Sequence, residues 1–312
     1  MIVPTHDARE LTLACLRALD ASLGLGSLEI VVVDDGSRDG SFDAIAAAHP
    51  HVKLVRLDPG CGFTVAVNTG VASATGRDLA LLNSDTEVAP DALARLVAAL
   101  DRDAALGVAG AALVYPNGED QWSAGSEPSL AWLFVLSSGL ATLAHRLAAY
   151  RRWRRRDGAG PEVQPVGWVP GAAIVVRRSA WEAVGPLDTR FALYAQDLDL
   201  CVRVRRAGWS VALVRGARVV HHLGATIGAL PESSADRAQR ALLWTDLVRW
   251  AHRARGPRFG HAARHALLAG AWLRVALTAL GALPRDRRDR AAHGAAIAAL
   301  TGFDVTRDAP NR

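Results

Sequence analysis

The sequence predicts an α/β protein with a mostly parallel central sheet, helices on both faces of the sheet, and a helical segment at the C-terminus. Short, continuously apolar runs alternate with helical patterns in the first 115 residues, as is typical of parallel strands buried on both faces. The chain is 50% hydrophobic and 21% charged, which is ordinary for a globular protein and excludes disorder. After Pro231 the composition becomes rich in alanine, leucine and arginine, and its pattern is helical.

The first half supplies the strands and helices of this sheet in regular order. The chain begins in a strand, at Ile2 and Val3, and further strands are predicted at Glu29–Val33, Val52–Leu57, Asp78–Leu82 and Val108–Val114. Helices are predicted between them, at Arg9–Ser22, Ser41–His49, Thr64–Ala74 and Pro90–Asp101. Ligands of such sheets bind at the carboxyl ends of the strands, so the polar residues there are the candidate site.

The alternation stops after Tyr115, where a turn sequence, an apolar helical run at Leu130–Leu147 and an arginine cluster follow. A second structured block then comprises Val166–Val176, a helix from about Ser179, a helix at Gln196–Ala207, and strands that end at His221. These changes of pattern divide the chain into residues 1–115, residues 116–230 and a helical segment of residues 231–312.

Charge and cysteine content limit the cellular setting. The net charge is +5, and nearly all the positive charge is arginine, because Lys53 is the only lysine. Cys15, Cys61 and Cys201 are scattered and follow no metal-binding spacing, which favours a reducing cytoplasm. The N-terminal residues do not resemble a signal peptide.

Carboxylates follow two of the predicted strands. Asp34 and Asp35 end the second strand, where they can accept hydrogen bonds from a nucleobase and ribose, although aspartate at this place can also cap a helix. Asn83, Ser84 and Asp85 end the fourth strand. A carboxylate such as Asp85, together with substrate phosphates, is a common arrangement for Mg²⁺, but Asn-Ser-Asp is also a frequent turn.

The later block adds a carboxylate and an imidazole. A helix that starts near Gln196 has Asp197 and Asp199 in its first turn, where the helix dipole favours anions with or without catalysis. Asp199 is four residues before Arg203 and can pair with it, which leaves Asp197 available as a general base. His221 and His222 follow a strand, and a neutral imidazole there can bind a divalent metal or be purely structural.

In order and spacing, these segments resemble the family 2 glycosyltransferases of the GT-A fold, especially the bacterial rhamnosyltransferase-like branch of cell-wall and polysaccharide assembly. The resemblance extends from residue 1 to about residue 228. It rests on matching segments that include, in chain order, Ile2-Val3-Pro4-Thr5, Val31-Val32-Val33-Asp34-Asp35-Gly36-Ser37, Asn68-Thr69-Gly70, Leu82-Asn83-Ser84-Asp85, Trp168-Val169-Pro170-Gly171, Tyr194-Ala195-Gln196-Asp197 and His221-His222-Leu223-Gly224.

The resemblance implies an inverting glycosyltransferase that uses a nucleotide-diphosphate sugar, either dTDP-rhamnose or a UDP-sugar, and a glycan or polyprenyl-diphosphate-linked acceptor. It makes residues 1–115 the donor-binding half and residues 116–230 the acceptor-binding half. Asp197 would be the catalytic base, and Mg²⁺ or Mn²⁺ would be bound by Asp85 and His221, with His222 the less favoured ligand. The donor would contact Thr5, Asp34, Asp35, Asn83 and Ser84, and the acceptor would contact Trp168, Gly171 and Gln196.

Three positions differ from the family pattern. Gln196 replaces the usual glutamate before the base, Gly60 replaces a frequent asparagine, and His6-Asp7 replaces tyrosine-asparagine. These changes leave a non-catalytic nucleotide-sugar-binding homologue as the alternative. A dinucleotide-dependent oxidoreductase is excluded, because no Gly-x-Gly-x-x-Gly follows the first strand, and a P-loop lysine motif is also missing.

Two segments raise the question of a membrane. Ala266–Leu283 is long enough to span a bilayer, but Arg274 near its middle would cost about 2.5–3.5 kcal/mol, so we expect an interfacial or packed helix. The cluster Arg151–Arg156 can bind anionic headgroups or form a solvated loop. We therefore expect a cytoplasmic protein, either free in the cytoplasm or peripheral at the inner face of the cell membrane. No nucleic-acid recognition fold is predicted.

Overall fold

The computed structural model describes residues 1–141, 161–191, 193–222, 232–283 and 287–304. The chain forms two compact units, and each unit draws on several segments. Unit 1 comprises Met1–Ser126, Arg154–Asp188 and Gln196–Thr226. Unit 2 comprises Glu127–Trp153, Thr189–Ala195 and Ile227–Arg312. The division of the chain at residues 115 and 230 stays a prediction, because the units are distinguished by packing rather than by chain order.

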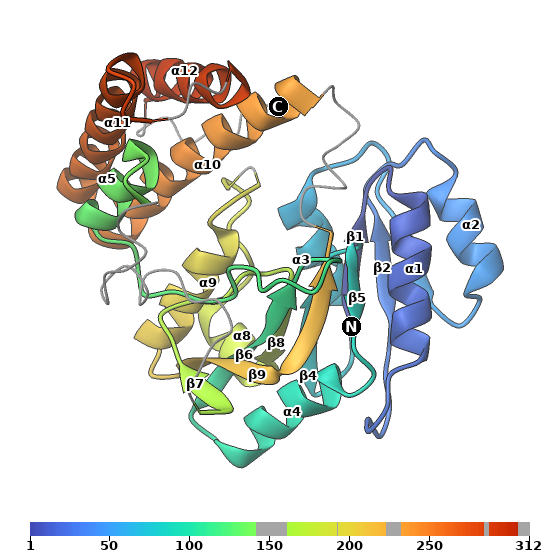
Figure 1. Cartoon of the computed structure of the whole chain (residues 1–312). Coiled ribbons are helices and arrows are strands. Elements are labelled where there is room, and N and C mark those ends of the chain that lie inside the picture. The colour runs from blue at the N-terminus through green and yellow to red at the C-terminus, as the bar shows by residue number, and fades with distance from the viewer. Residues whose placement is uncertain (142–160, 192, 223–231, 284–286, 305–312) are drawn as a thin grey trace. The chain divides into compact units, whose positions relative to one another are not determined.

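Unit 1 is built on one mixed sheet (Figure 1). Counted over the described residues, it has nine strands, in the order β3-β2-β1-β4-β8-β6-β9-β5, with β7 paired to β9 beside this path. The four strands at one end of this order are mutually parallel; they are β3 (Lys53–Arg56), β2 (Val31–Asp34), β1 (Ile2–Thr5) and β4 (Asp78–Leu82). The connecting helices are α1 (Arg9–Asp20), α2 (Ser41–Ala48) and α3 (Phe63–Ser73).

The rest of the sheet contains both strand directions. Strand β8 (Ala173–Arg177) runs antiparallel to β4 and to β6 (Leu106–Val114), and β9 (Ser210–His221) is parallel to β6. The short strands β5 (Thr86–Val88) and β7 (Val163–Pro165) are antiparallel to β9. The helices of this part are α4 (Ala92–Arg102), α8 (Arg178–Val184) and α9 (Gln196–Arg206). With three residues, β5 is too short to produce the periodicity from which strands were predicted.

The predicted block Val166–Val176 forms a strand only from Ala173 onward. Pro170 has no backbone N–H to donate, and the N–H of Gly171 donates to a side chain instead of a neighbouring strand. Residues 166–172 therefore form a connection rather than a longer strand, and it leads from the start of β9, where the N–H of Val166 donates to Val211, to the end of β4, where Ala172 accepts from Asn83.

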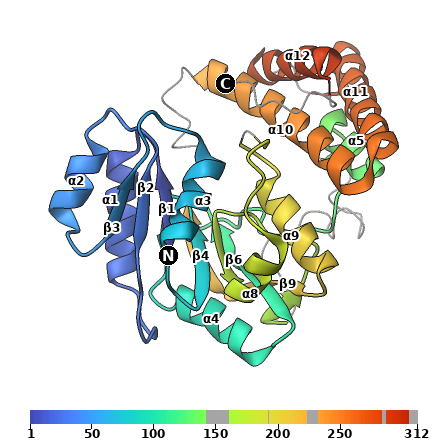
Figure 2. The ribbon, with the colours of Figure 1, turned by 180° about the vertical axis from the view of Figure 1, so that it is seen from behind.

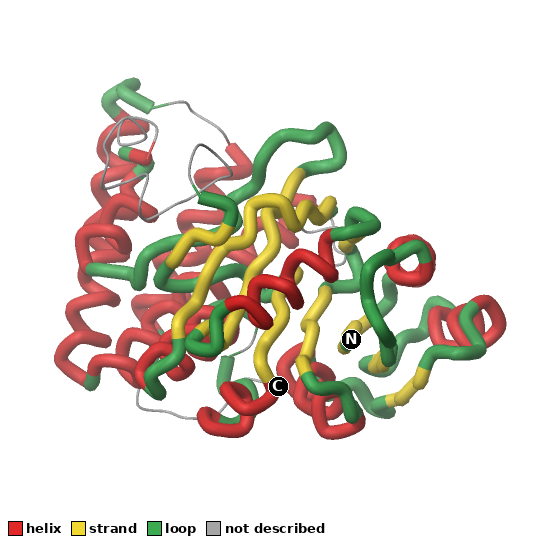
Figure 3. The backbone as a smooth tube through the Cα atoms, turned by 90° about the horizontal axis from the view of Figure 1, so that it is seen from below, coloured by secondary structure: helices red, strands yellow, loops and turns green. Residues whose placement is uncertain are grey.

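Helices cover both faces of the sheet, which explains the continuously apolar strands. Val32 packs into a cluster with α1 and α4, whereas its neighbours Val31 and Val33 pack against α3 through Ala66. All nine residues of β6 are buried. Figure 2 shows α3, α8 and α9 on one face and α1 and α4 on the other, and Figure 3 shows helices on both sides of the strands. The predicted two-sided α/β architecture is confirmed.

Unit 2 is helical and contains α5 (Leu130–Ser138), α10 (Glu232–Arg255), α11 (Pro257–Ala279) and α12 (Arg287–Gly302). The helix predicted at Leu130–Leu147 ends at Ser138, because Gly139 adopts a left-handed φ of 76°. Residues from 142 to 160, which include the arginine cluster Arg151–Arg156, lie outside the described residues. Among the described helices, none combines the length and apolar character needed to cross a membrane.

A buried aspartate joins the C-terminal helices to an earlier segment within unit 2. Asp246 on α10 is fully buried and accepts hydrogen bonds from the backbone N–H groups of Leu193 and Tyr194, at 3.1 and 3.0 Å. Its carboxylate also pairs with Arg249. The segment immediately before α9 is therefore held by α10, so the C-terminal helices do more than extend the chain.

One close approach inside the sheet can be tested. A Cβ added at Gly110 on β6 would lie 2.6 Å from Cβ of Val169, whereas a Cβ at the exposed Gly26 would meet nothing within 4 Å. We expect Gly110→Ala to destabilise the protein by about 1–3 kcal/mol through overpacking. Gly26→Ala should stay within about 0.5 kcal/mol of the parent. Urea unfolding of both variants measures this, and equal midpoints would contradict the packing described for Gly110.

Candidate active site

The carboxyl ends of β1 and β2 bring Thr5, Asp34 and Asp35 together. Thr5 pairs with Asp34 in register, and the N–H of Asp35 donates to the carbonyl of Thr5 at 2.8 Å. Asp34 is fully buried; its Oδ1 accepts from the N–H of Ser37 at 3.1 Å, and its Oδ2 lies 3.8 Å from Nε of Arg56. Asp34 thus supports the turn after β2 and does not cap the following helix, because the N-cap residue of α2 is Gly40.

Asp35 holds the loop before α3. Its two carboxylate oxygens accept from the N–H groups of Cys61 and Gly62 at 2.6 and 2.9 Å. Gly60 lies so close to the backbone carbonyl of Asp35 that a Cβ there would collide with it, which explains why a glycine occupies this position. An ionised carboxylate offers about four acceptor sites, so Asp35 can still accept hydrogen bonds from a ligand.

A carboxylate and an imidazole face each other where β5 begins and β9 ends. Oδ1 of Asp85 lies 3.6 Å from Nε2 of His221, and both side chains are buried. The strands set this contact, because Thr86 pairs in register with His221 and the N–H of His222 donates to the carbonyl of Asp85 at 2.9 Å. The side chain of His222 instead lies 2.8 Å from Glu87.

Gln121 determines which nitrogen of His221 carries the proton. Its amide nitrogen donates to the carbonyl oxygens of His221 and Val114, at 2.6 and 3.2 Å, so its oxygen is left to accept from Nδ1 of His221 at 3.0 Å. The neutral ring therefore presents the lone pair of Nε2 to Asp85. Burial, and to a smaller extent the nearby His222, lowers the pKa of His221 from 6.5 to about 4. A carboxylate oxygen beside a neutral imidazole lone pair is a suitable donor set for a divalent cation.

Sequence patterns gave no indication of Gln121. It lies in the turn region that follows β6, where Val114 bridges to Asp120 and the N–H of Gln121 donates to the carbonyl of Leu113 at 2.8 Å. A polar residue after a Pro-Asn-Gly turn is usually exposed, whereas Gln121 is 3% exposed. Only the fold reveals that this turn returns Gln121 to the end of β9.

Asp197 lies at a cavity beside the end of β4. The lining combines the polar residues Asn83, Gln196 and Asp197 with Gly171 and with apolar side chains from Pro4, Phe63, Val67, Leu81, Leu82, Ile174, Leu187 and Leu200. Oδ2 of Asp197 accepts from the N–H of Gly171 at 2.8 Å, and its Oδ1 accepts from the N–H of Leu198 at 2.7 Å. Burial raises the pKa of Asp197 above its usual 3.8, although these hydrogen bonds oppose the shift.

The neighbouring acid of the same helix is engaged elsewhere. Oδ2 of Asp199 pairs with Nε of Arg203 at 2.6 Å, as the spacing of the two residues predicts. Arg203 also donates to the carbonyls of Val184, Gly185 and Pro186. Asp199 therefore anchors α9, and Asp197 is the carboxylate that faces the cavity.

Strand pairing connects the cavity to the carboxylate–imidazole pair. The N–H of Asn83 donates to the carbonyl of Ala172 at 2.9 Å, directly after Gly171, whose N–H holds Asp197. Asn83 is followed by Ser84 and Asp85, and Ser84 is buried. The structure thus links Asn83, Asp85, Gly171, Gln196, Asp197 and His221 through adjacent strand ends.

Trp168 is placed differently from the expectation that it borders an acceptor. Its ring packs edge-on against Trp122, with centroids 5.1 Å apart, and its backbone pairs with Gly125. It is not among the residues that line the cavity. Its buried indole N–H has no hydrogen-bond partner among the described residues, so a ligand oxygen remains a suitable partner.

The fold and this site together define a glycosyltransferase of the GT-A fold. Residues 1–165, more than half of the chain, match the sequence profile of "Glycosyl transferase family 2". The chain belongs to this family, and it is an enzyme of the glycosyltransferase class.

Relatives of known name agree with this assignment. The chain is 30% identical over 230 residues to "N-acetylglucosaminyl-diphospho-decaprenol L-rhamnosyltransferase" of Mycobacterium tuberculosis, covering 68% of this chain and 73% of that protein. It is 26% identical over 247 residues to "O-antigen biosynthesis protein RfbC" of Myxococcus xanthus, covering 75% of this chain and 18% of that protein.

Solved structures share the fold. A mannosyltransferase from Pyrobaculum calidifontis, solved with GDP-Man and Mn²⁺, superposes with a TM-score of 0.60 at 21% identity, covering 96% of this chain and 84% of that one. Residues 1–349 of S. aureus TarS superpose with a TM-score of 0.54 at 14% identity, covering 90% of each chain. At these identities the likeness is one of fold.

The role of Gln121 leads to a prediction. Gln121→Leu removes the acceptor of the Nδ1 proton of His221 and should raise the Mn²⁺ concentration needed for half-maximal sugar transfer by about 10–100-fold. Gln164→Leu, on β7, is the matched control and should leave this requirement unchanged. The measurement is the initial rate of transfer against Mn²⁺ concentration. If both variants need the same Mn²⁺ concentration as the parent, Gln121 does not position His221.

Proposed function

We propose that this protein transfers a sugar, with inversion, from a nucleotide-diphosphate donor to a hydroxyl of a glycan or polyprenyl-diphosphate-linked acceptor. The observation that carries the proposal is the half-buried Asp197 carboxylate at a cavity, linked through Asn83 to the facing pair Asp85 and His221. The donor is dTDP-rhamnose or a UDP-sugar. The name of the Mycobacterium tuberculosis relative, a decaprenol-linked rhamnosyltransferase, supports rhamnose and a lipid-linked acceptor.

The residues present fit a divalent cation. Asp85 and His221 would hold Mg²⁺ or Mn²⁺, since their ligand atoms are 3.6 Å apart and Gln121 keeps Nε2 unprotonated. Such an ion, when bound, neutralises charge that develops on a departing diphosphate. The Mn²⁺ in the similar Pyrobaculum calidifontis structure supports this choice.

Asp197 would accept the proton of the acceptor hydroxyl. A general base works best when its pKa approaches the operating pH, and burial shifts the pKa of Asp197 in that direction. The N–H groups of Gly171 and Leu198 fix the orientation of its carboxylate. Gln196 is neutral, so it adds no second charge that would raise the pKa of Asp197 further.

Inversion follows from the number of carboxylates. Asp197 is the only acidic residue among the described residues that line the cavity. A retaining double displacement needs a carboxylate nucleophile in addition to the acid–base group. With Asp197 as the base, the acceptor oxygen attacks the anomeric carbon directly, its proton passes to Asp197, and the nucleoside diphosphate leaves from the opposite side.

Donor contacts would come from the ends of the parallel strands. Thr5, Asp34 and Asp35 lie together there, and Asn83 and Ser84 connect them to the cation pair. The hydroxyl of Thr5 is held by Thr12 at 2.7 Å, so the residues that would hold the nucleotide are ordered before it binds. On the acceptor side we assign Trp168, Gly171 and Gln196.

The proposal is tested by measuring donor binding and sugar transfer separately in one variant. Asp197→Asn should abolish transfer, by about 10²–10⁴-fold or more, because it removes the base. Addition of dTDP-rhamnose with Mn²⁺ should still raise the thermal midpoint of this variant as it does for the parent, because the donor binds at other residues. Thermal-shift assays with dTDP-rhamnose, UDP-glucose and GDP-mannose, run beside a transfer assay, measure both effects.

Asp199→Asn is the control, because it changes the neighbouring acid that pairs with Arg203. This substitution should lower the stability of the protein, whereas the protein that stays folded should keep its transfer activity. Full activity of Asp197→Asn would reject this residue as the base. Absence of stabilisation by every nucleotide sugar would reject the donor class.

A lipid-linked acceptor would require access to a membrane surface, and α11 offers a suitable face. Trp272 and Val275 on the helix and its C-cap Leu280 are 59%, 40% and 82% exposed, and the nearby Ala269, Ala276 and Ala279 are also exposed. The three-to-four-residue spacing places them along one side of the helix. We propose that this side inserts into the interfacial layer of the bilayer, where tryptophan is favoured.

Vesicle flotation tests this surface. Full-length protein should float with vesicles of phosphatidylglycerol and cardiolipin, and Trp272→Ser combined with Leu280→Ser should reduce the floated fraction several-fold by removing apolar area that enters the bilayer. The matched control is Leu23→Ser, which changes a 64% exposed leucine in unit 1 and should float as the parent does. Equal flotation of all three proteins would reject α11 as the contact.

A further inference from the structure

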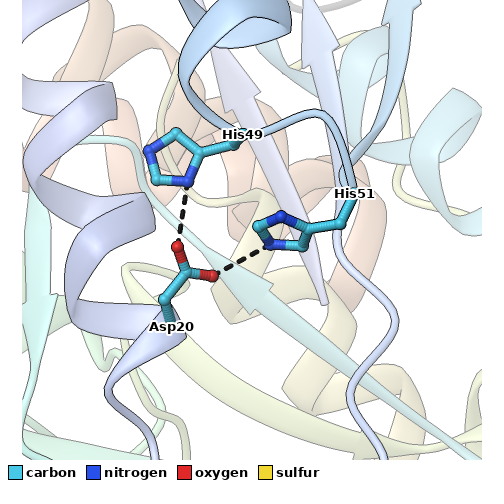
Figure 4. Close-up of side chains that lie close together, drawn as sticks. All are labelled: Asp20, His49 and His51. Carbon is cyan, nitrogen blue, oxygen red and sulfur yellow. Dashed lines mark hydrogen bonds and ion pairs between the residues drawn. The ribbon is translucent and has the colours of Figure 1, made fainter.

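Three metal-ligand side chains meet away from the active site. Asp20 is the last residue of α1, and His49 and His51 lie on either side of Pro50, between α2 and β3. Figure 4 shows both imidazole rings directed at the Asp20 carboxylate. Nδ1 of His49 lies 3.0 Å from Oδ2 of Asp20, and Nε2 of His51 lies 2.9 Å from Oδ1.

The backbone orders this cluster in advance. The N–H of Val52 donates to the carbonyl of His49 at 3.0 Å, which closes a turn with Pro50 at its second position. His49 is buried with a side chain 6% exposed, whereas His51 and Asp20 are 55% and 39% exposed. One ligand is therefore fixed in the protein interior, and the other two are accessible from solvent.

The position of Asp20 favours a cation beside it. A carboxylate at the C-terminal end of a helix lies at the negative pole of the helix dipole, which is unfavourable unless positive charge is near. Imidazole N–H groups can donate hydrogen bonds to Asp20, but a neutral imidazole ring brings no net charge. A metal ion bound by the same three side chains would supply it.

The chemistry of the ligands selects a class of metal. The three ligand atoms lie within 4.8 Å of one another. Zn²⁺ binds imidazole nitrogen and carboxylate oxygen at about 2.0–2.2 Å, so all three atoms can reach one ion with small side-chain rotations. Two imidazoles favour Zn²⁺, Co²⁺ or Ni²⁺ over Mg²⁺, which prefers oxygen ligands. Solvent access to His51 leaves a coordination position for water.

The cluster lies at the edge of the sheet opposite the active site. Strands β1, β2 and β3 begin in register at Ile2, Val31 and Lys53, next to His51, and they end on the side of Thr5 and Asp34. Helix α1 runs back from the end of β1 to this starting edge, which is where Asp20 lies. A metal here would therefore not contact donor or acceptor.

We infer that Asp20, His49 and His51 form a second metal site, specific for a Zn²⁺-like dication, that ties the end of α1 to the turn before β3. Binding replaces the two imidazole protons that face Asp20 in the metal-free protein, so these protons are lost from the ring nitrogens as the metal–nitrogen bonds form. The bound ion stabilises unit 1, because the unfolded chain does not hold the three ligands together.

Cobalt titration of the chelator-treated, tag-free full chain tests this inference. Mg²⁺ in excess occupies oxygen-rich sites, and Co²⁺ is then added while its visible absorption and the thermal midpoint are followed. The parent should bind a single Co²⁺ per chain and melt at a higher temperature. His51→Ala should weaken binding by about tenfold or more and abolish the thermal shift. Because His51 is exposed, this variant should fold and should retain sugar transfer.

Two control variants locate the ion. His261→Ala removes an exposed histidine of α11, and Asp85→Asn removes the proposed catalytic ligand; both should bind Co²⁺ like the parent. The inference is overturned if the parent shows no saturable binding, which leaves a hydrogen-bonded His–Asp–His cluster. It is also overturned if His51→Ala binds like the parent, or if Asp85→Asn alone abolishes binding. None of these results depends on whether the proposed donor is correct.

Discussion

The antiparallel pairing of β4 with β8 is the constraint on which the active site depends. Within the described part of the chain, it is the only link in the strand order between the parallel strands that carry Thr5 and Asp34 and the mixed strands that carry His221. Its last pair, Leu82 with Ala173, continues into the bond from Asn83 to Ala172, and Gly171 then holds Asp197. A shift of one residue in this register would turn every side chain of the shifted strand to the opposite face and separate the base from the cation pair.

Burial has opposite effects on the two titratable groups that matter most. It raises the pKa of Asp197, and it lowers the pKa of His221 to about 4, because a low dielectric disfavours the charged form of either group. Asp197 becomes a stronger base, and His221 stays neutral with its Nε2 lone pair available. Both effects are useful for glycosyl transfer, and both cost stability that the surrounding hydrophobic core must offset.

The structure also changes the view of the C-terminal helices. Leu193 and Tyr194 lie just before α9 in the chain, yet they belong to unit 2, where Asp246 accepts their backbone hydrogen bonds. Because Asp246 is fully buried, loss of these bonds would leave buried carboxylate oxygens with fewer hydrogen-bond donors, which costs stability even though Arg249 still pairs with the carboxylate. The helices after residue 231 are thus part of what orders the chain that leads into the base-bearing helix.

The sequence by itself determined the two-sided sheet, most helix bounds and the candidate residues at strand ends, because apolar periodicity and strand-end position are local properties. It also predicted the pair of Asp199 and Arg203, whose partners are four residues apart. Tertiary structure alone decided that Gln121 fixes the imidazole of His221 and that Trp168 packs on Trp122. Gln121 and His221 are a hundred residues apart in the sequence. Such contacts depend on strand register and on where a turn returns the chain, and no local pattern encodes either.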